Sequence, residues 1–401
     1  MKSSSFASNF FLTSAFLSSM LLQGTFYILF HLLAFLYFFI KLPRFYSIHF
    51  FVLFVISGIT IFALSSLFFD YRANDIFRDF IYLCKPMISV LLGYQFALLN
   101  NSKRILVTSA FFAVFVYFVF YVSQIIISDA DIASMTVQQW RVTTGAGEFL
   151  VPLLIILIHT KFIKLSNNLK MICLAVLYFQ VVITFSRSAY LFLLIYHLTN
   201  YFLGHKLPIR LLKYSLLFVF VLVVTFVISV YNSEMNNGGL ITKILNSSNE
   251  LRPNFTVDPS EAGLAWRGFE AALFFNDLAT YSYLEILIGK GLGYVIELPF
   301  IIKLGGKEYS DLWFVHNGYL YMFMKLGLVS IGIFIFCISK FYRSCKSYDW
   351  QYTIVRTLTL FVIMSTIVMA GPLESNDFAG ILIVMGYFYA HKLQRSRIYE
   401  E

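Results

Sequence analysis

The feature that most constrains this chain is a succession of twelve apolar runs separated by short polar segments. They lie at residues 7–22, 25–40, 46–69, 80–99, 105–127, 147–160, 171–185, 189–203, 213–231, 312–338, 352–370 and 376–391. A helix needs about 20 apolar residues to cross the bilayer core, and shorter helices are tolerated where neighbours shield them. The runs predict an all-α, polytopic membrane protein with about twelve transmembrane helices, forming one integral membrane domain over residues 1–401.

The composition excludes the soluble classes of protein. Hydrophobic residues make up 59% of the chain and charged residues 13%, against roughly 25% charged residues in a soluble domain. A soluble core could not hide 46 Phe and 26 Tyr without a matching polar surface. A soluble enzyme and a nucleic-acid binder are therefore both excluded, and the net charge of +9 needs another explanation.

That explanation is the positive-inside rule, because the basic residues gather in alternate loops. The predicted inner segments hold 18 of the 30 basic residues and 3 of the 21 acids. Two long stretches, 7–40 and 171–203, could each be one helix or two, but each has cationic residues at both ends. Each must therefore cross and return, with turns at 23–25 and 186–188. Both termini then lie in the cytoplasm.

One large polar segment, residues 232–311, separates the ninth and tenth runs and faces outward in this topology. Part of it has apolar residues at helical spacing, namely Ala262, Ala265, Trp266, Phe269, Ala272 and Leu273. We expect short helices that lie on the outer membrane face and cap a cavity.

Arg187 is the most informative polar residue. It lies between two predicted spans of about 15 residues, each rising about 22 Å against a hydrocarbon core of roughly 30 Å. Arg187 is therefore expected below the outer surface, where a guanidinium marks a functional site and suits a diphosphate group. An interfacial arginine that extends towards the headgroups is the alternative. Ser186 and Ser188, which flank it, are further candidates for substrate binding.

His316 and Asn317 lie at the outer end of the tenth run. A histidine there can take a proton from a hydroxyl near neutral pH, although a lone interfacial histidine is more often structural. Asn317 could fix the ring or bind a sugar. The other six histidines form no cluster, and no metal site is expected.

Three further cationic residues are candidates for contact with phosphate or sugar. Lys85 lies in the outer half of the fourth run, where anion contact and outward extension are both open. Arg267 could close over a phosphate or pair with Glu270 at i,i+3. Arg141 lies in the outer loop 128–146, where a solvated side chain is the simpler interpretation.

Four features occur together between residues 171 and 340. They are the large outer loop before the tenth span, the Ser-Arg-Ser turn at 186–188, the Arg267-Gly-Phe-Glu-Ala-Ala stretch with its later Gly-rich segment at 289–293, and His316-Asn-Gly-Tyr-Leu running into Lys325-Leu-Gly. This combination resembles the superfamily of O-antigen polymerases and O-antigen ligases.

The resemblance implies a metal-independent glycosyltransferase without cofactors at the outer face of a bacterial inner membrane. His316 would take the proton from the acceptor hydroxyl, and Arg187, helped by Arg267 and Lys85, would hold the donor diphosphate. The expected partners are an undecaprenyl-diphosphate-linked oligosaccharide, the bilayer, a chain-length regulator and a flippase.

The acceptor separates the members of this superfamily. We favour a polymerase for O-antigen or another surface polysaccharide, which transfers the glycan onto another lipid-linked repeat unit. A ligase that transfers it onto the lipid A core in lipopolysaccharide biosynthesis is the alternative. A transporter or flippase of lipid-linked sugar is a third class, but its usual repeat symmetry is not found here.

Overall fold

The computed structural model describes residues 2–21, 26–41, 70–100, 103–127, 149–162, 164–184, 186–202, 266–304, 307–343, 350–368, 371–373, 376 and 378–398. Helices contain 82% of these residues. Each predicted apolar run within them contains a helix, and the runs 46–69 and 213–231 lie outside the described residues. The long stretches 7–40 and 171–203 are each divided into two helices, as the flanking charges predict.

The helices in the body of the molecule are α1 (Lys2–Leu21), α2 (Phe26–Lys41), α4 (Ala73–Asn100), α5 (Lys103–Ile127), α7 (Leu150–His159), α8 (Asn167–Thr184), α9 (Arg187–Phe202), α14 (Gly318–Arg343), α15 (Trp350–Val368) and α16 (Phe378–Ile398). Three described helices, α4, α5 and α14, are long and apolar enough to cross a membrane. The other apolar helices are shorter. The structure therefore supports a largely helical protein with three candidate spans, and the count of about twelve goes beyond it.

Helices α4 and α16 form the closest pairing in the body. A side chain at Gly93 would place its Cβ 1.8 Å from the carbonyl oxygen of Ile383, and one at Gly386 would meet the carbonyl oxygen of Val90 at 1.9 Å. The two backbones are therefore in direct contact, a packing that only small residues allow between membrane helices.

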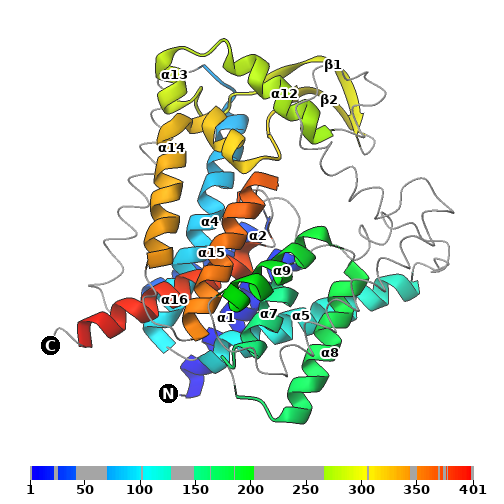
Figure 1. Cartoon of the computed structure of the whole chain (residues 1–401), viewed down its shortest axis with the longest axis vertical. Helices are drawn as coiled ribbons and strands as arrows, with labels where there is room; N and C mark the ends of the chain where they lie inside the picture. Colours follow the sequence, from blue (N-terminus) through cyan, green and yellow to red (C-terminus); the bar gives the residue numbers. More distant parts are fainter. Residues whose placement is uncertain are drawn as a thin grey trace.

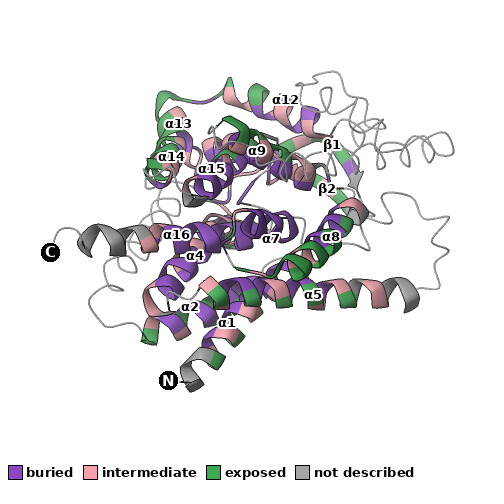
Figure 2. Cartoon of the chain, turned by 60° about the horizontal axis from the view of Figure 1, so that its bottom comes forward, coloured by how far each residue is buried: buried purple, intermediate pink, exposed green. Residues whose placement is uncertain are grey.

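An aromatic cluster joins four helices of the body. The ring of Phe192 on α9 stacks on Phe361 of α15 with centroids 4.1 Å apart, and Phe361 stacks in turn on Phe378 of α16. Phe149, next to α7, lies 4.5 Å from Phe378. Every residue of α7 is buried, as Figure 2 shows. Neighbouring helices thus shield α7, which is too short to cross the bilayer core without such shielding.

A cap covers the end of the body opposite the chain termini (Figure 1). It consists of α12 (Trp266–Leu278), α13 (Tyr283–Ile288) and an antiparallel hairpin of β1 (Ile296–Leu304) and β2 (Lys307–Leu312). The prediction of short helices in segment 232–311 is confirmed for α12 and α13. The hairpin corrects the all-α prediction: Ile296, Ile302 and Leu312 are buried, so the strands supply apolar side chains that cover α12.

Helix α12 turns its apolar face towards the protein. Phe269 and Ala272 are buried, and the Phe269 ring stacks on Phe300 of β1 at 5.7 Å. The described part of the amphipathic stretch thus packs on the hairpin, and its place on the outer membrane face stays a prediction.

Candidate functional site

The centre of the candidate site is a carboxylate–imidazole pair formed by Glu270 of α12 and His316, which lies between β2 and α14. Oε1 and Oε2 of Glu270 lie 2.8 and 2.9 Å from Nδ1 of His316. The backbone N–H of His316 also donates to Oε2, at 3.0 Å. Glu270 is 1% exposed. A single buried carboxylate thus holds both the backbone and the ring of His316.

This pairing decides which ring nitrogen of His316 carries the proton. An ionised carboxylate only accepts hydrogen bonds, so Nδ1–H is the donor to Glu270 and Nε2 is the nitrogen that can accept a proton. The His316 side chain is 34% exposed, while its partner is buried. A partly exposed histidine that is oriented by a buried carboxylate is an arrangement suited to general-base catalysis.

The segment that follows His316 is fixed by a helix cap. Oδ1 of Asn317 accepts hydrogen bonds from the backbone N–H groups of Tyr319 and Leu320, at 3.0 and 3.2 Å. These are the unpaired donors at the start of α14, and an asparagine is among the best residues to satisfy them. Asn317 therefore has a clear structural role beside the histidine, and sugar binding through its amide stays a prediction.

Helix α14 is broken at Gly327, whose φ of 65° and ψ of −163° are not helical. The backbone N–H groups of Lys290 and Gly291 donate to the carbonyl groups of Met324 and Lys325, each at 3.0 Å. The Gly-rich segment 289–293 thus acts as a clamp on the kink.

The side chain of Lys290 is also held by protein groups. Its Nζ lies 3.1 Å from Oδ1 of Asp277 and donates to the hydroxyl of Tyr294 at 3.2 Å. The Tyr294 hydroxyl donates to the same Asp277 oxygen at 2.7 Å. Burial and this hydrogen bond to a carboxylate raise the pKa of Tyr294, so that the phenol keeps its proton and the contact at neutral pH.

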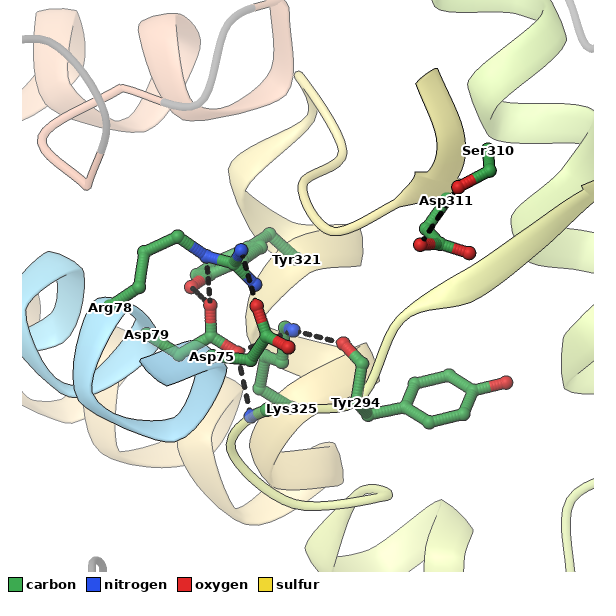
Figure 3. A network of polar contacts seen from close by, with 9 residues as sticks. Asp75, Arg78, Asp79, Tyr294, Ser310, Asp311, Tyr321 and Lys325 are labelled. Atoms are coloured by element: carbon green, nitrogen blue, oxygen red, sulfur yellow. Dashed lines mark hydrogen bonds and ion pairs between the residues drawn. The ribbon is translucent and has the colours of Figure 1, made fainter. Parts of the chain in front are cut away.

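A buried ion pair connects α4 to the kinked helix, as Figure 3 shows. Nζ of Lys325 lies 2.5 Å from Oδ2 of Asp79 and also donates to the carbonyl oxygen of Tyr294. The hydroxyl of Tyr321 donates to Oδ1 of Asp79 at 3.2 Å, and the N–H of Gly293 donates to Oδ2 at 2.8 Å. Asp79 and Lys325 are both fully buried. The network explains the charge of Lys325 in an apolar run, because that charge has a carboxylate partner.

A row of aromatic and cationic side chains connects α4 with the histidine. Nζ of Lys85 lies 4.1 Å from the ring centroid of Tyr82, which is 5.8 Å from the ring of Phe314. Phe314 in turn meets the His316 ring at 5.9 Å, nearly at right angles. Lys85, a sequence-based candidate, is therefore two aromatic rings away from His316. Its Nζ also donates to Oδ1 of Asn376 at 3.2 Å.

No described contact connects the other residues predicted for the site to His316. Ser186 is buried and caps α9, since its Oγ accepts from the N–H of Ala189 at 3.2 Å. Arg187 begins α9, and Ser188 follows it, half-buried. The side chain of Arg187 and the whole of Arg141 lie outside the described part of the structure.

Arg267 lies on α12, one turn before Glu270, and is half-buried. The carboxylate of Glu270 is bonded to His316, so the alternative i,i+3 pair of Arg267 with Glu270 is not formed among the described residues. Contact of Arg267 with a phosphate stays a prediction.

Sequence reasoning missed the carboxylate that orients the histidine, because it considered Glu270 only as a partner of Arg267. A usable signal exists: Glu270 is an acid on the same face of the amphipathic stretch as the apolar Phe269 and Phe274. It also left Lys325 unexplained and did not consider Asp79. Lys325 lies within an apolar run and Asp79 at the edge of another, and a charge inside a membrane segment favours a partner of opposite sign.

Within the described residues, no group of three or more His, Cys, Asp or Glu side chains is placed to hold a metal ion. Comparison of the chain with protein-family models, curated proteins and solved structures gives no match. The function is therefore argued from the site.

Proposed function

We propose that this protein is a membrane-embedded glycosyltransferase that polymerises a surface polysaccharide such as O-antigen. It transfers a glycan from undecaprenyl diphosphate onto a sugar hydroxyl of another lipid-linked repeat unit. The observation that carries the proposal is the buried Glu270 carboxylate on Nδ1 of His316. The family resemblance, and not a match to a known protein, supplies the identity of the donor.

In the proposed reaction the acceptor oxygen attacks the anomeric carbon of the donor glycan. As the new C–O bond forms, the bond from the anomeric carbon to the diphosphate oxygen breaks, and the electron pair leaves with the diphosphate. Nε2 of His316 takes the hydroxyl proton, and Glu270 stabilises the imidazolium that forms. The donor already carries a good leaving group, so the reaction needs no nucleotide or metal.

The cations proposed to hold the diphosphate are Arg187, Arg267 and Lys85. They would offset the negative charge that develops on the leaving group. Support for Lys85 comes from its aromatic connection to His316 through Tyr82 and Phe314. Arg187 and Arg267 are assigned by the resemblance. Asn317, Ser186, Ser188 and Arg141 would contribute to the same site from their loops.

The proposed topology has about twelve spans, both termini in the cytoplasm and the site facing the periplasm. Contacts at the two ends of the body support this orientation. At the proposed outer end, Lys85 contacts Asn376 and lies 5.1 Å from the ring of Tyr27. At the proposed inner end, Nζ of Lys103 lies 5.4 Å from the ring of Phe162. Residues that the charge pattern assigns to one side of the membrane thus contact each other.

Gene deletion with analysis of surface glycans by gel electrophoresis tests this function. A polymerase predicts loss of the ladder with a band of core plus one repeat remaining. Loss of every repeat from the core, with lipid-linked polymer accumulating, would identify a ligase instead. An unchanged ladder would contradict both, and accumulation of single lipid-linked units on the cytoplasmic side would favour a flippase. Complementation with His316→Ala, at equal membrane abundance, should not restore the ladder.

A further inference from the structure

Helix α13 exposes an apolar face that no described part of the protein covers. Tyr283, Leu284, Leu287 and Ile288 are 93%, 61%, 50% and 37% exposed. At 100° per residue these four positions fall within an arc of about 140°, and Glu285 lies outside it. Helix α12 of the same cap buries Phe269, Ala272 and Phe274 and exposes Phe275, whereas none of the residues of α13 is buried.

The position of α13 is fixed by its contact with the kink of α14. A Cβ at Gly327 would lie 2.3 Å from the carbonyl oxygen of Leu287, and one at Gly289 would lie 2.4 Å from the backbone nitrogen of Leu326. The hydrogen bonds of Lys290 and Gly291 to the carbonyl groups of α14 continue this contact. With so little space between the two backbones, α13 has no room to rotate and hide its apolar face.

The exposed face of α13 continues an exposed apolar surface on α14. Directly after the kink, Leu328 and Val329 are exposed, and Ile333 and Phe336 follow further along the helix. Helix α14 is one of the three candidate spans, and 22% of its most apolar stretch is buried within the protein. A span with so little protein around it presents its surface to lipid. Helix α13 therefore lies next to the end of a lipid-facing surface on α14.

The charges near α13 are turned away from this face. The carboxylate of Glu285 accepts from the N–H and the hydroxyl of Ser282, both at 2.7 Å, in a capping box. Lys290 is paired with Asp277. The exposed side of α13 is therefore apolar with an aromatic residue at its start, a composition typical of a helix at the membrane–water boundary.

We propose that α13 is a membrane-binding helix, whose residues Tyr283, Leu284, Leu287 and Ile288 insert among the acyl chains of the leaflet next to the kink of α14. The occupant of the exposed face is thus lipid. A second copy of the chain and a partner protein are the competing occupants, and the test below separates them. One consequence rests on the proposed function: a lipid-linked donor could keep its tail in this leaflet while its diphosphate approaches His316 along the first half of α14.

The test uses single spin labels in the full chain, reconstituted into liposomes of phosphatidylethanolamine and phosphatidylglycerol. Cys84, Cys173, Cys337 and Cys345 are first replaced by alanine, and one cysteine is then introduced for each labelled protein. The labels are placed at Leu284 and Leu287, with controls at Ile333 on α14 and Asn276 on the exposed side of α12. Collisions of each label with oxygen, which partitions into lipid, and with a water-soluble nickel chelate are measured by electron paramagnetic resonance.

Lipid contact predicts that the labels at 284 and 287 resemble Ile333, with frequent oxygen collisions and few nickel collisions, while Asn276 gives the reverse. Labels at 284 and 287 that collide mainly with nickel would overturn the proposal. So would labels protected from both reagents, and dipolar broadening in that case would identify a second copy of the chain as the occupant. None of these readings depends on glycan transfer, so failure here and failure of the proposed function are distinguishable.

Discussion

Replacing Glu270 by glutamine should reduce glycan transfer while leaving His316 in place. The carboxylate accepts two donors, the backbone N–H and the Nδ1–H of His316. Glutamine has one acceptor oxygen. If that oxygen takes the place of Oε2, it satisfies the backbone N–H and lies 2.9 Å from Nδ1, while the amide NH2 takes the place of Oε1, 2.8 Å from Nδ1. The NH2 group then favours the tautomer in which Nδ1 accepts and the ring proton is on Nε2. The nitrogen needed as the base is then protonated.

The size of the effect follows from the hydrogen bond that is lost. A hydrogen bond to a charged group contributes about 1.5–3 kcal/mol. Because 1.4 kcal/mol corresponds to a factor of ten, the share of the productive tautomer should fall by about 10- to 150-fold. Removal of the base itself in His316→Ala should cost more, about 100- to 10,000-fold. The loss in Glu270→Gln should be in kcat, with KM for the lipid-linked donor little changed.

The assay measures the steady-state rate of transfer against donor concentration by purified protein in liposomes, with wild type, Glu270→Gln, His316→Ala and a matched control. The control is Glu297→Gln, because Glu297 is an exposed acid on β1 of the same cap. Wild-type rates in Glu270→Gln, with the protein folded and inserted, would refute the argument that the carboxylate selects the tautomer. A loss equal to that of Glu297→Gln would refute it equally.

Three further predictions concern the clamp, the buried pair and the capping box of α13. Gly289 has φ 78° and ψ −179°, a conformation that almost only glycine adopts, so Gly289→Ala adds about 1–3 kcal/mol of strain to a backbone clash and should lower the thermal unfolding temperature in detergent. Gly332→Ala, whose Cβ meets nothing within 4 Å, should not. Lys325→Met removes the closest ion-pair partner of the buried Asp79, which keeps Nε of Arg78 at 3.5 Å, and should destabilise by up to about 3–5 kcal/mol. Asp79→Asn added to Lys325→Met should recover most of that loss in chemical unfolding, and no recovery would contradict the pairing. The capping hydrogen bonds lower the pKa of Glu285 below its ordinary 4.5. The stabilisation of α13 by these bonds is therefore complete above pH 4.5 and is lost as the pH falls through the lowered pKa of Glu285 in the folded protein. A spin label at position 287 should become mobile only at that acidic pH. In Glu285→Gln, whose side chain can cap the helix but does not titrate, the label should not become mobile.

The sequence predicts the helices well because apolar runs and charged flanks are local features. The division of 171–203 into two helices follows from cationic residues at both ends, and the structure has that break at Ser186. The number of spans is less accessible. Whether a helix as short as α7 crosses a bilayer depends on which neighbours surround it, and those contacts come from distant parts of the chain.

The site was predictable only in part, since its central pair joins residues 46 positions apart. His316 could be selected from its place at the end of a run. The partner could not, because local spacing favours Arg267 as the partner of Glu270 and only the packing of α12 on the hairpin turns Glu270 towards His316. The hairpin was missed because short helices were predicted for segment 232–311, which contains both strands. The helix predicted from residue 312 begins only at Gly318.

The most direct test of the central claim measures glycan transfer by the purified protein in liposomes whose sole glycan substrate is the undecaprenyl-diphosphate-linked repeat unit. The account predicts that wild-type protein releases undecaprenyl diphosphate and lengthens the glycan, and that His316→Ala does neither. Release and elongation by His316→Ala at the wild-type rate would contradict it. A wild-type protein that moves the lipid-linked unit across the bilayer without lengthening its glycan would contradict it as well.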